Sequence, residues 1–241
     1  MTETTTATAA TEVRQPGLLS RIIGVIFSPR ETYAAVAARP RWLGVMAITL
    51  VIGVAATYVM LSSPEMQDAA FDQALARIQA EPSDQQVATI ETFISNMPLI
   101  YAAASFIVGP LFVAAIAGLF VWIFSMLMGG SGTFRQVFAI VAHSGVISMF
   151  SGVFSAALIA AGVPPTGAQP PSANLGVFVP MLDEMSFVTM FLSAFNLILI
   201  WWLVSLAIGL GVLYKRRTGP IAVTFMSLYV VIALIIAVVR S

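Results

Sequence analysis

The chain has 241 residues, of which 59% are hydrophobic and only 9% are charged, and its formal net charge at pH 7 is zero. A water-soluble domain carries about a quarter charged residues because its surface must face water, so this composition is typical of a protein whose surface lies mostly in lipid. The absence of cysteine excludes disulfides, thiolate metal sites and cysteine nucleophiles. Nothing in the composition indicates nucleic acid, a metal or a cofactor as a ligand, and we expect none of the three.

The chain begins with a segment that cannot cross a membrane. Residues 1–16 are rich in Thr and Ala without apolar periodicity, which predicts a disordered tail. Residues 17–41 then predict two interfacial amphipathic helices. The first has an apolar face about ten residues long, enough to lie in the membrane interface but not to span it. That face comprises Leu19, Ile22, Ile23 and Ile26. No small-residue cleavage site follows, so a signal peptide is not favoured.

The second amphipathic helix has clear start and stop signals. Ser28 is placed to be its N-cap, Pro29 its first residue, and Glu31 the partner of Ser28 in a capping box. Pro40 ends it. The next residues are typical of the boundary between cytoplasm and membrane: Arg39, Arg41 and Trp42.

The region 42–241 contains five apolar runs, each long enough for the roughly 20 residues that cross a hydrocarbon core of about 30 Å. They cover 42–61, about 98–128, 137–162, 186–213 and about 220–239. None has an acidic residue, Lys or Arg in its interior, as helices that face lipid require. The sequence therefore predicts an all-α, polytopic integral membrane protein with five transmembrane helices.

Positive charge lies mostly on one side of these spans. Nine of the eleven basic residues precede the first span or lie in the second and fourth connections: Arg14, Arg21, Arg30, Arg39, Arg41, Arg135, Lys215, Arg216 and Arg217. The positive-inside rule places this side, with the N-terminus, in the cytoplasm and the C-terminus outside. Arg14 and Arg21 are also placed to meet anionic headgroups.

The first outer loop, residues 62–97, predicts two short amphipathic helices. The first starts at Ser63-Pro64-Glu65, and the second has Ser83 as its N-cap. A helical hairpin packed over the ends of the spans is the favoured interpretation, with a partner-docking surface as the alternative.

Two polar residues inside the spans are candidate functional groups. His143 is the only ionisable side chain within a span and lies about 9 Å inside it. A neutral imidazole bonded to a neighbouring helix is favoured over a proton relay, because the spans offer no second titratable partner. Asn196 is expected near the midplane, where it most often ties helices together. A polar path along both residues, in a transporter or channel component, is the alternative.

Small side chains recur every four residues along the third span: Ser144, Ser148, Gly152, Ala156 and Ala160. Such a ladder lets another helix backbone approach closely, so we expect the third span to be central to the bundle. Ser205 with Gly209 forms a shorter pair in the fourth span. Whether the ladder packs within this chain, against a second copy or against another membrane protein stays open.

No enzyme site emerges from the sequence. Gly129-Gly130-Ser131-Gly132-Thr133 is superficially similar to a phosphate loop, but it lacks the lysine and the preceding strand, so an interhelical turn is predicted. The spans hold no carboxylate pair, and a lone histidine does not establish a hydrolase.

Three stretches carry a resemblance to a known family: "IFSPRETYAAVAARPRW", "TFRQVFAIVAHSGVIS" and "FLSAFNLILIWWLVSLAIGLGVLYKRR". Over about residues 18–239 the chain resembles the Yip family (Ypt/Rab GTPase-interacting membrane proteins) in its bacterial form. The resemblance implies a five-span protein of the bacterial inner membrane. Eukaryotic relatives act in membrane traffic through Rab-type GTPases and carry an Asp-Leu-Tyr-Gly-Pro motif, which is missing here. We therefore expect no Rab-type partner, but a non-enzymatic protein that scaffolds or organises the bilayer.

Overall fold

The computed structural model describes residues 16–78, 81–166, 169–179, 181–183 and 186–240. Across these ranges the chain is helical, and its extended pairing is limited to two isolated bridges, Thr166 with Gln169 and Asn174 with Asn196. The predicted tail lies outside the described residues apart from Pro16, and so does Arg14.

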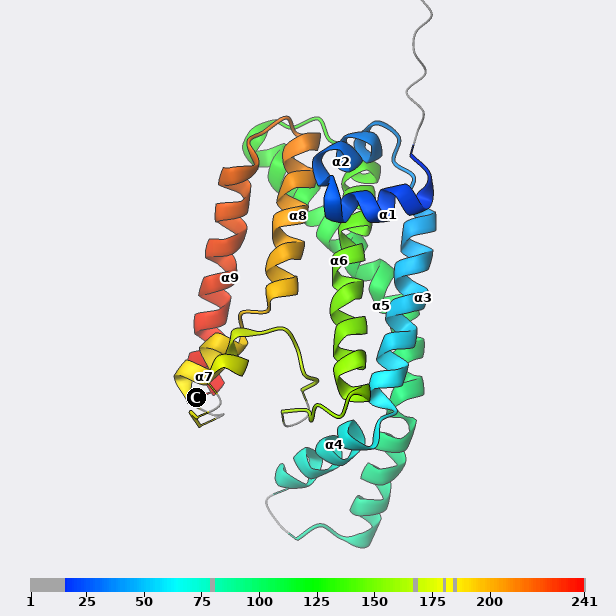
Figure 1. The fold of residues 1–241 in the computed structure, drawn as a ribbon, viewed down its shortest axis with the longest axis vertical. Helices are drawn as coiled ribbons and strands as arrows, with labels where there is room; N and C mark the ends of the chain where they lie inside the picture. The colour runs from blue at the N-terminus through cyan, green and yellow to red at the C-terminus, as the bar shows by residue number, and fades with distance from the viewer. Residues whose placement is uncertain (1–15, 79–80, 167–168, 180, 184–185, 241) are drawn as a thin grey trace, which may run out of the picture.

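The two N-terminal helices, α1 (Leu18–Phe27) and α2 (Pro29–Ala38), lie across one end of the helix bundle, here called the α1–α2 end (Figure 1). Ser28 and Pro29 occupy the predicted N-cap and first positions of α2. The capping box with Glu31 is wrong, because the Ser28 side chain makes no cap hydrogen bond. Ser28 is also the residue that ends α1, where its N–H donates to the Gly24 carbonyl, and this tight junction sets its backbone conformation.

Five helices run along the long axis of the molecule: α3 (Leu43–Leu61), α5 (Asp84–Met128), α6 (Phe134–Ala160), α8 (Leu197–Leu213) and α9 (Thr218–Arg240) (Figure 1). Within the described residues, α3, α5, α6 and α9 are the 4 helices long and apolar enough to cross a membrane. They correspond to four of the five predicted spans. The 17 residues of α8 extend only about 26 Å, which is less than a hydrocarbon core of about 30 Å.

The fourth predicted span is not one continuous helix, so that prediction is wrong. A short helix, α7 (Phe187–Ser193), is followed by a break, and α8 begins only at Leu197. The break falls at Asn196, whose side chain accepts hydrogen bonds from the backbone N–H groups of the next turn. Asparagine competes in this way with the helical pairing of the backbone, and hydropathy does not register that competition.

The loop after α3 forms one of its two predicted helices as a separate element. α4 (Pro64–Ala76) starts at the predicted N-cap, Ser63. The second helix also starts at its predicted cap, Ser83, but it continues without a break through Pro98 into the span, so a separate short helix is wrong. A proline removes one backbone hydrogen bond, and here the helix on both sides of Pro98 continues past that loss. α4 and the start of α5 project beyond the bundle as a hairpin (Figure 1).

The hairpin is held against the bundle by a small apolar cluster of four buried residues from α3, α4, α5 and α6: Leu61, Met66, Met97 and Ile159. This packing supports the favoured interpretation, in which a helical hairpin packs against the ends of the spans.

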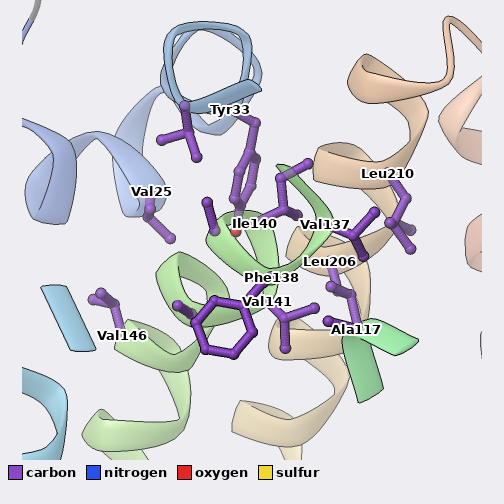
Figure 2. Close-up of a cluster of buried hydrophobic side chains, with 14 of the residues drawn as sticks. Val25, Tyr33, Ala117, Val137, Phe138, Ile140, Val141, Val146, Leu206 and Leu210 are labelled. Atoms are coloured by element: carbon purple, nitrogen blue, oxygen red, sulfur yellow. The ribbon is translucent and has the colours of Figure 1, made fainter. Parts of the chain in front are cut away.

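The main core lies at the α1–α2 end and surrounds the first half of α6 (Figure 2). Val25 of α1 and Tyr33 of α2 meet Ile140 there, and Leu206 and Leu210 of α8 complete the cluster. α6 contacts α1, α2, α3, α5 and α8, which confirms the central position predicted for the third span.

Candidate functional site

His143 lies in the buried first half of α6 and faces Arg21 of α1. The Arg21 Nη1 atom is 3.4 Å from His143 Nε2, and His143 Nδ1 is 2.7 Å from the Ala139 carbonyl oxygen. A guanidinium group can only donate, so Nε2 must accept from Arg21. The proton of the imidazole is then on Nδ1, which donates to Ala139, and His143 is the neutral tautomer.

Arg21 links three segments. Besides its contact with His143, its Nη1 atom donates to the Arg41 carbonyl oxygen at 2.7 Å. Burial, and after it the positive charge of Arg41, lowers the pKa of Arg21, although a guanidinium stays charged at neutral pH. Its Nε atom is buried without a partner. Arg21 therefore ties α1 to α6 and to the segment before α3, a role that charge placement alone did not indicate.

Tyr33 forms a second polar contact at this end. Its fully buried ring passes from α2 to α8, where its hydroxyl lies 2.7 Å from Ser205 Oγ. Burial raises the pKa of Tyr33 well above its usual range. A Cβ atom placed on Gly209 would come within 3.2 Å of the Tyr33 ring and 2.5 Å of Ile140 Cγ2. The pair Ser205 and Gly209 thus does permit close approach of α2 to α8. Tyr33 itself was not predicted, because no sequence pattern distinguishes a tyrosine that packs against a span from one on the surface.

The ladder of small residues on α6 does not form one continuous interface. Ser144 is buried and donates to the Val141 carbonyl, whereas Ser148 and Ala160 are exposed. Gly152 faces α3, where an added Cβ would lie 3.7 Å from Ala56 Cβ. The remaining member, Ala156, is half-buried. Part of the ladder therefore packs within this chain.

An apolar cavity of about 460 Å³ lies between α3, α5 and α6 and is lined by Gly53, Gly109, Gly145 and Gly152 among others. Neither His143 nor Asn196 lines it. His143 is ten residues, about 15 Å, from the N-cap of α6, and Asn196 is at the opposite end of α8, about 26 Å away from the α1–α2 end. This cavity does not join the two residues in one polar path.

Asn196 is an N-cap and not a residue inside a helix, which corrects the expected position within a span. Its Oδ1 atom accepts from the N–H groups of Ile198 at 2.9 Å and Leu199 at 3.1 Å. The hydroxyl of Tyr229 on α9 donates to the Ala194 carbonyl and accepts from the Asn196 N–H at 3.1 Å. The Tyr229 side chain thus links the backbone of the break to α9.

The model of the Yip1 domain family matches residues 23–240, from α1 to the end of α9. The chain belongs to the Yip1 domain family. No curated protein and no solved structure matches it. The match confirms the resemblance to the Yip family, and together with the four long apolar helices it identifies an integral membrane protein.

The α5–α6 connection of this Yip1 domain is the predicted interhelical turn. Gly129 has φ +60°, a left-handed conformation that suits glycine, and Thr133 caps α6 in a capping box with Gln136. The ring of Tyr214, which stacks on Phe124 with centroids 4.3 Å apart, lies against the glycines of the turn.

The remaining boundary residues of the Yip1 domain take different positions. Trp42 packs edge-on against Phe138 of α6, with ring centroids 4.9 Å apart, whereas Arg39 and Arg41 are exposed. The basic triplet Lys215–Arg217 is also exposed and forms the turn between α8 and α9.

Proposed function

We propose that this protein is a non-enzymatic integral membrane protein that organises the bilayer, with α1 as the element that acts on lipid. The N-terminus and the α1–α2 end face the cytoplasm, and the C-terminus is outside the bacterial inner membrane. The positive charges at the α1–α2 end support this orientation. Membership of a family not known for enzymatic activity supports the non-enzymatic role.

The observation that carries the proposal is that α1 has two apolar faces. One packs on the bundle through Leu18 and Ile22. The other leaves three side chains exposed at a spacing of four residues, Leu19 (70%), Ile23 (56%) and Phe27 (81%). A helix across the end of a membrane bundle places such a stripe at the level of the headgroups, where burying it in lipid is favourable. Ile22 and Ile26, expected on this face, are half-buried against the core.

α1 is held firmly enough to act as a wedge. Gly24 approaches α2 so closely that an added Cβ would lie 2.2 Å from Thr32 Oγ1. Arg21 ties the helix to His143 and Arg41. A fixed helix that inserts its stripe into one leaflet adds area to that leaflet alone, and binding of this kind depends on curvature.

In this proposal the chain crosses the membrane five times, and α8 makes the fourth crossing. α8 is short, but the break before it has partners for its backbone. The N–H of Leu175 donates to the Phe195 carbonyl and that of Leu197 to the Ala173 carbonyl, at 3.1 and 2.8 Å. Non-helical backbone is tolerated within a membrane where protein groups satisfy it in this way. The exposed members of the α6 ladder, Ser148 and Ala160, leave room for a second copy or another membrane protein.

The test is the distribution of reconstituted protein between membranes of different curvature. Leu19→Ser, Ile23→Ser and Phe27→Ser are combined in one variant, because serine removes the apolar stripe without touching the bundle. We expect the wild type to be enriched in small vesicles over large ones, and the triple variant to lose this enrichment.

A matched control keeps the stripe apolar with Leu19→Met, Ile23→Leu and Phe27→Leu, and should sort like the wild type. Equal sorting of the wild type and the triple serine variant would overturn the proposal. Insertion is measured in parallel by quenching of single labels at the same three positions, which the cysteine-free sequence makes straightforward.

A further inference from the structure

We infer that the turn between α8 and α9, together with α2, forms a binding site for a phosphate group. A cavity of about 490 Å³ lies between these elements at the α1–α2 end. It is lined by Arg30 and Ala34 of α2, Gly211 at the end of α8, and the basic triplet Lys215–Arg217. Arg30 comes from a part of the chain far from the triplet, so the fold brings four cationic side chains to one cavity.

Among the described residues, no acidic side chain pairs with any of these four cations. In the part of the chain that the structure describes, none of them has an ion pair or a side-chain hydrogen bond, and all four are exposed. Glu31 follows Arg30 on α2 but does not line the cavity. Four positive charges around one cavity repel each other, and an anion between them removes that repulsion. Phosphate oxygens accept hydrogen bonds from guanidinium and ammonium groups together.

The backbone holds the triplet in a fixed shape. The Arg216 N–H donates to the Gly211 carbonyl at 2.8 Å, and the Lys215 N–H to the Val212 carbonyl at 3.3 Å, which is the Schellman pattern that ends many helices. Lys215 has φ +52°, a left-handed conformation that glycine adopts with less strain. The turn thus places a charged side chain where glycine would fold more easily, as residues at binding sites often do.

The position of the cavity points to its ligand. It lies where α8 ends and α9 begins, at the level of the lipid headgroups. Basic pockets between helices at this level suit anionic lipid headgroups. α9 starts directly after Arg217, so the positive end of its helix dipole lies next to the triplet and favours an anion there. A phosphate on a lipid headgroup and a free phosphate ion share this chemistry.

The experiment titrates the purified full-length protein in neutral detergent with phosphatidylglycerol, phosphatidylcholine or inorganic phosphate, and counts bound molecules by native mass spectrometry. We expect phosphatidylglycerol to bind more tightly than phosphatidylcholine. In the variant Arg30→Gln with Arg216→Gln, each lost cation should weaken phosphatidylglycerol binding about five-fold, or about 25-fold in total.

The control removes two exposed charges from the same end but outside the cavity, Arg39→Gln with Arg135→Gln, and should bind like the wild type. Lys215→Gly provides a second readout: binding should fall about five-fold while the thermal midpoint rises, because glycine relieves the strained turn.

Tight binding of phosphatidylglycerol identifies the lipid as the source of the phosphate. Binding of inorganic phosphate without a preference between the two lipids identifies a soluble source, provided that Arg30→Gln with Arg216→Gln and Lys215→Gly both weaken phosphate binding. The proposal is overturned if neither ligand binds, or if the control loses as much affinity as Arg30→Gln with Arg216→Gln. The stripe on α1 is not involved, so the curvature experiment can fail without affecting this result.

Discussion

Arg21 and His143 are 122 residues apart in the chain, and each supplies what the other lacks. The guanidinium needs an acceptor as it enters a half-buried position, and the imidazole offers one at Nε2 because its Nδ1 proton is held by Ala139. The sequence identified His143 as neutral and bonded to a neighbouring helix. It could not name the donor, because Arg21 lies outside the spans and its charge alone suggests lipid.

A double-mutant cycle tests this pair. We expect Arg21→Gln and His143→Leu each to lower the stability of the protein in detergent, and the two losses to be non-additive by about 1 kcal/mol, the net value of one hydrogen bond. The measurement is the free energy of unfolding of the four proteins. Arg39→Gln is the control for Arg21→Gln and should be additive with His143→Leu. Additivity for Arg21→Gln as well would mean that the contact contributes nothing.

Gly209 and Gly152 give a matched comparison of two helical glycines. A Cβ at Gly209 would collide with the buried methyl of Ile140, whereas at Gly152 it would make ordinary contact with Ala56. We expect Gly209→Ala to destabilise the protein by about 1–3 kcal/mol, as overpacking does, and Gly152→Ala to be tolerated. Thermal unfolding in detergent measures both, and an equal effect of the two substitutions would contradict the packing described at Tyr33.

Among the helices, α8 shows most clearly how one side chain changes an element. Residues 186–213 are mostly apolar and carry no charged side chain, and this composition alone predicts a single span. The helix breaks because Asn196 caps the next turn and Tyr229 of α9 satisfies the freed groups of Ala194 and Asn196. A break inside an apolar segment is stable only where such partners exist, and they come from another helix.

The break should therefore depend on Tyr229 as well as on Asn196. We expect Tyr229→Phe to cost about 1–3 kcal/mol, because it leaves the Ala194 carbonyl and the Asn196 N–H only the hydrogen bond that they make with each other. Asn196→Ala should cost about 1 kcal/mol through loss of the cap. Unfolding in detergent gives both values. Tyr58→Phe changes an exposed tyrosine and serves as control; a cost as large as that of Tyr229→Phe would show that the hydroxyl of Tyr229 does not hold the break.

In the whole molecule, dense packing is concentrated at the α1–α2 end. The first half of α6 is buried by five other helices there, whereas large side chains of its second half, such as Phe150 and Phe154, are exposed. A membrane protein can leave such side chains exposed because lipid covers them. The two N-terminal helices thus cover the end of the bundle that holds most of its core.

The orientation of the whole molecule has a direct test. Because the chain has no cysteine, Ser131→Cys places a single thiol in the α5–α6 turn and Asp72→Cys places one on α4, at opposite ends of the molecule. In intact cells we expect an impermeant maleimide to label Asp72→Cys and to leave Ser131→Cys unlabelled until the membrane is opened. The reverse pattern would invert the proposed topology, and labelling of both would contradict a membrane between the two sites.

The sequence by itself determined the all-helical class, the family, four of the five predicted apolar spans, and the helix starts at Ser63 and Ser83. These features depend on composition and on hydrogen bonds between near neighbours in the chain, and both can be inferred from a short stretch of sequence. Only the tertiary structure decided that α5 is continuous, that α8 starts at Leu197, and that Arg21 points into the bundle. The break before α8 and the position of Arg21 each depend on a group supplied from a distant part of the chain, and no pattern along the sequence records which distant group will be adjacent.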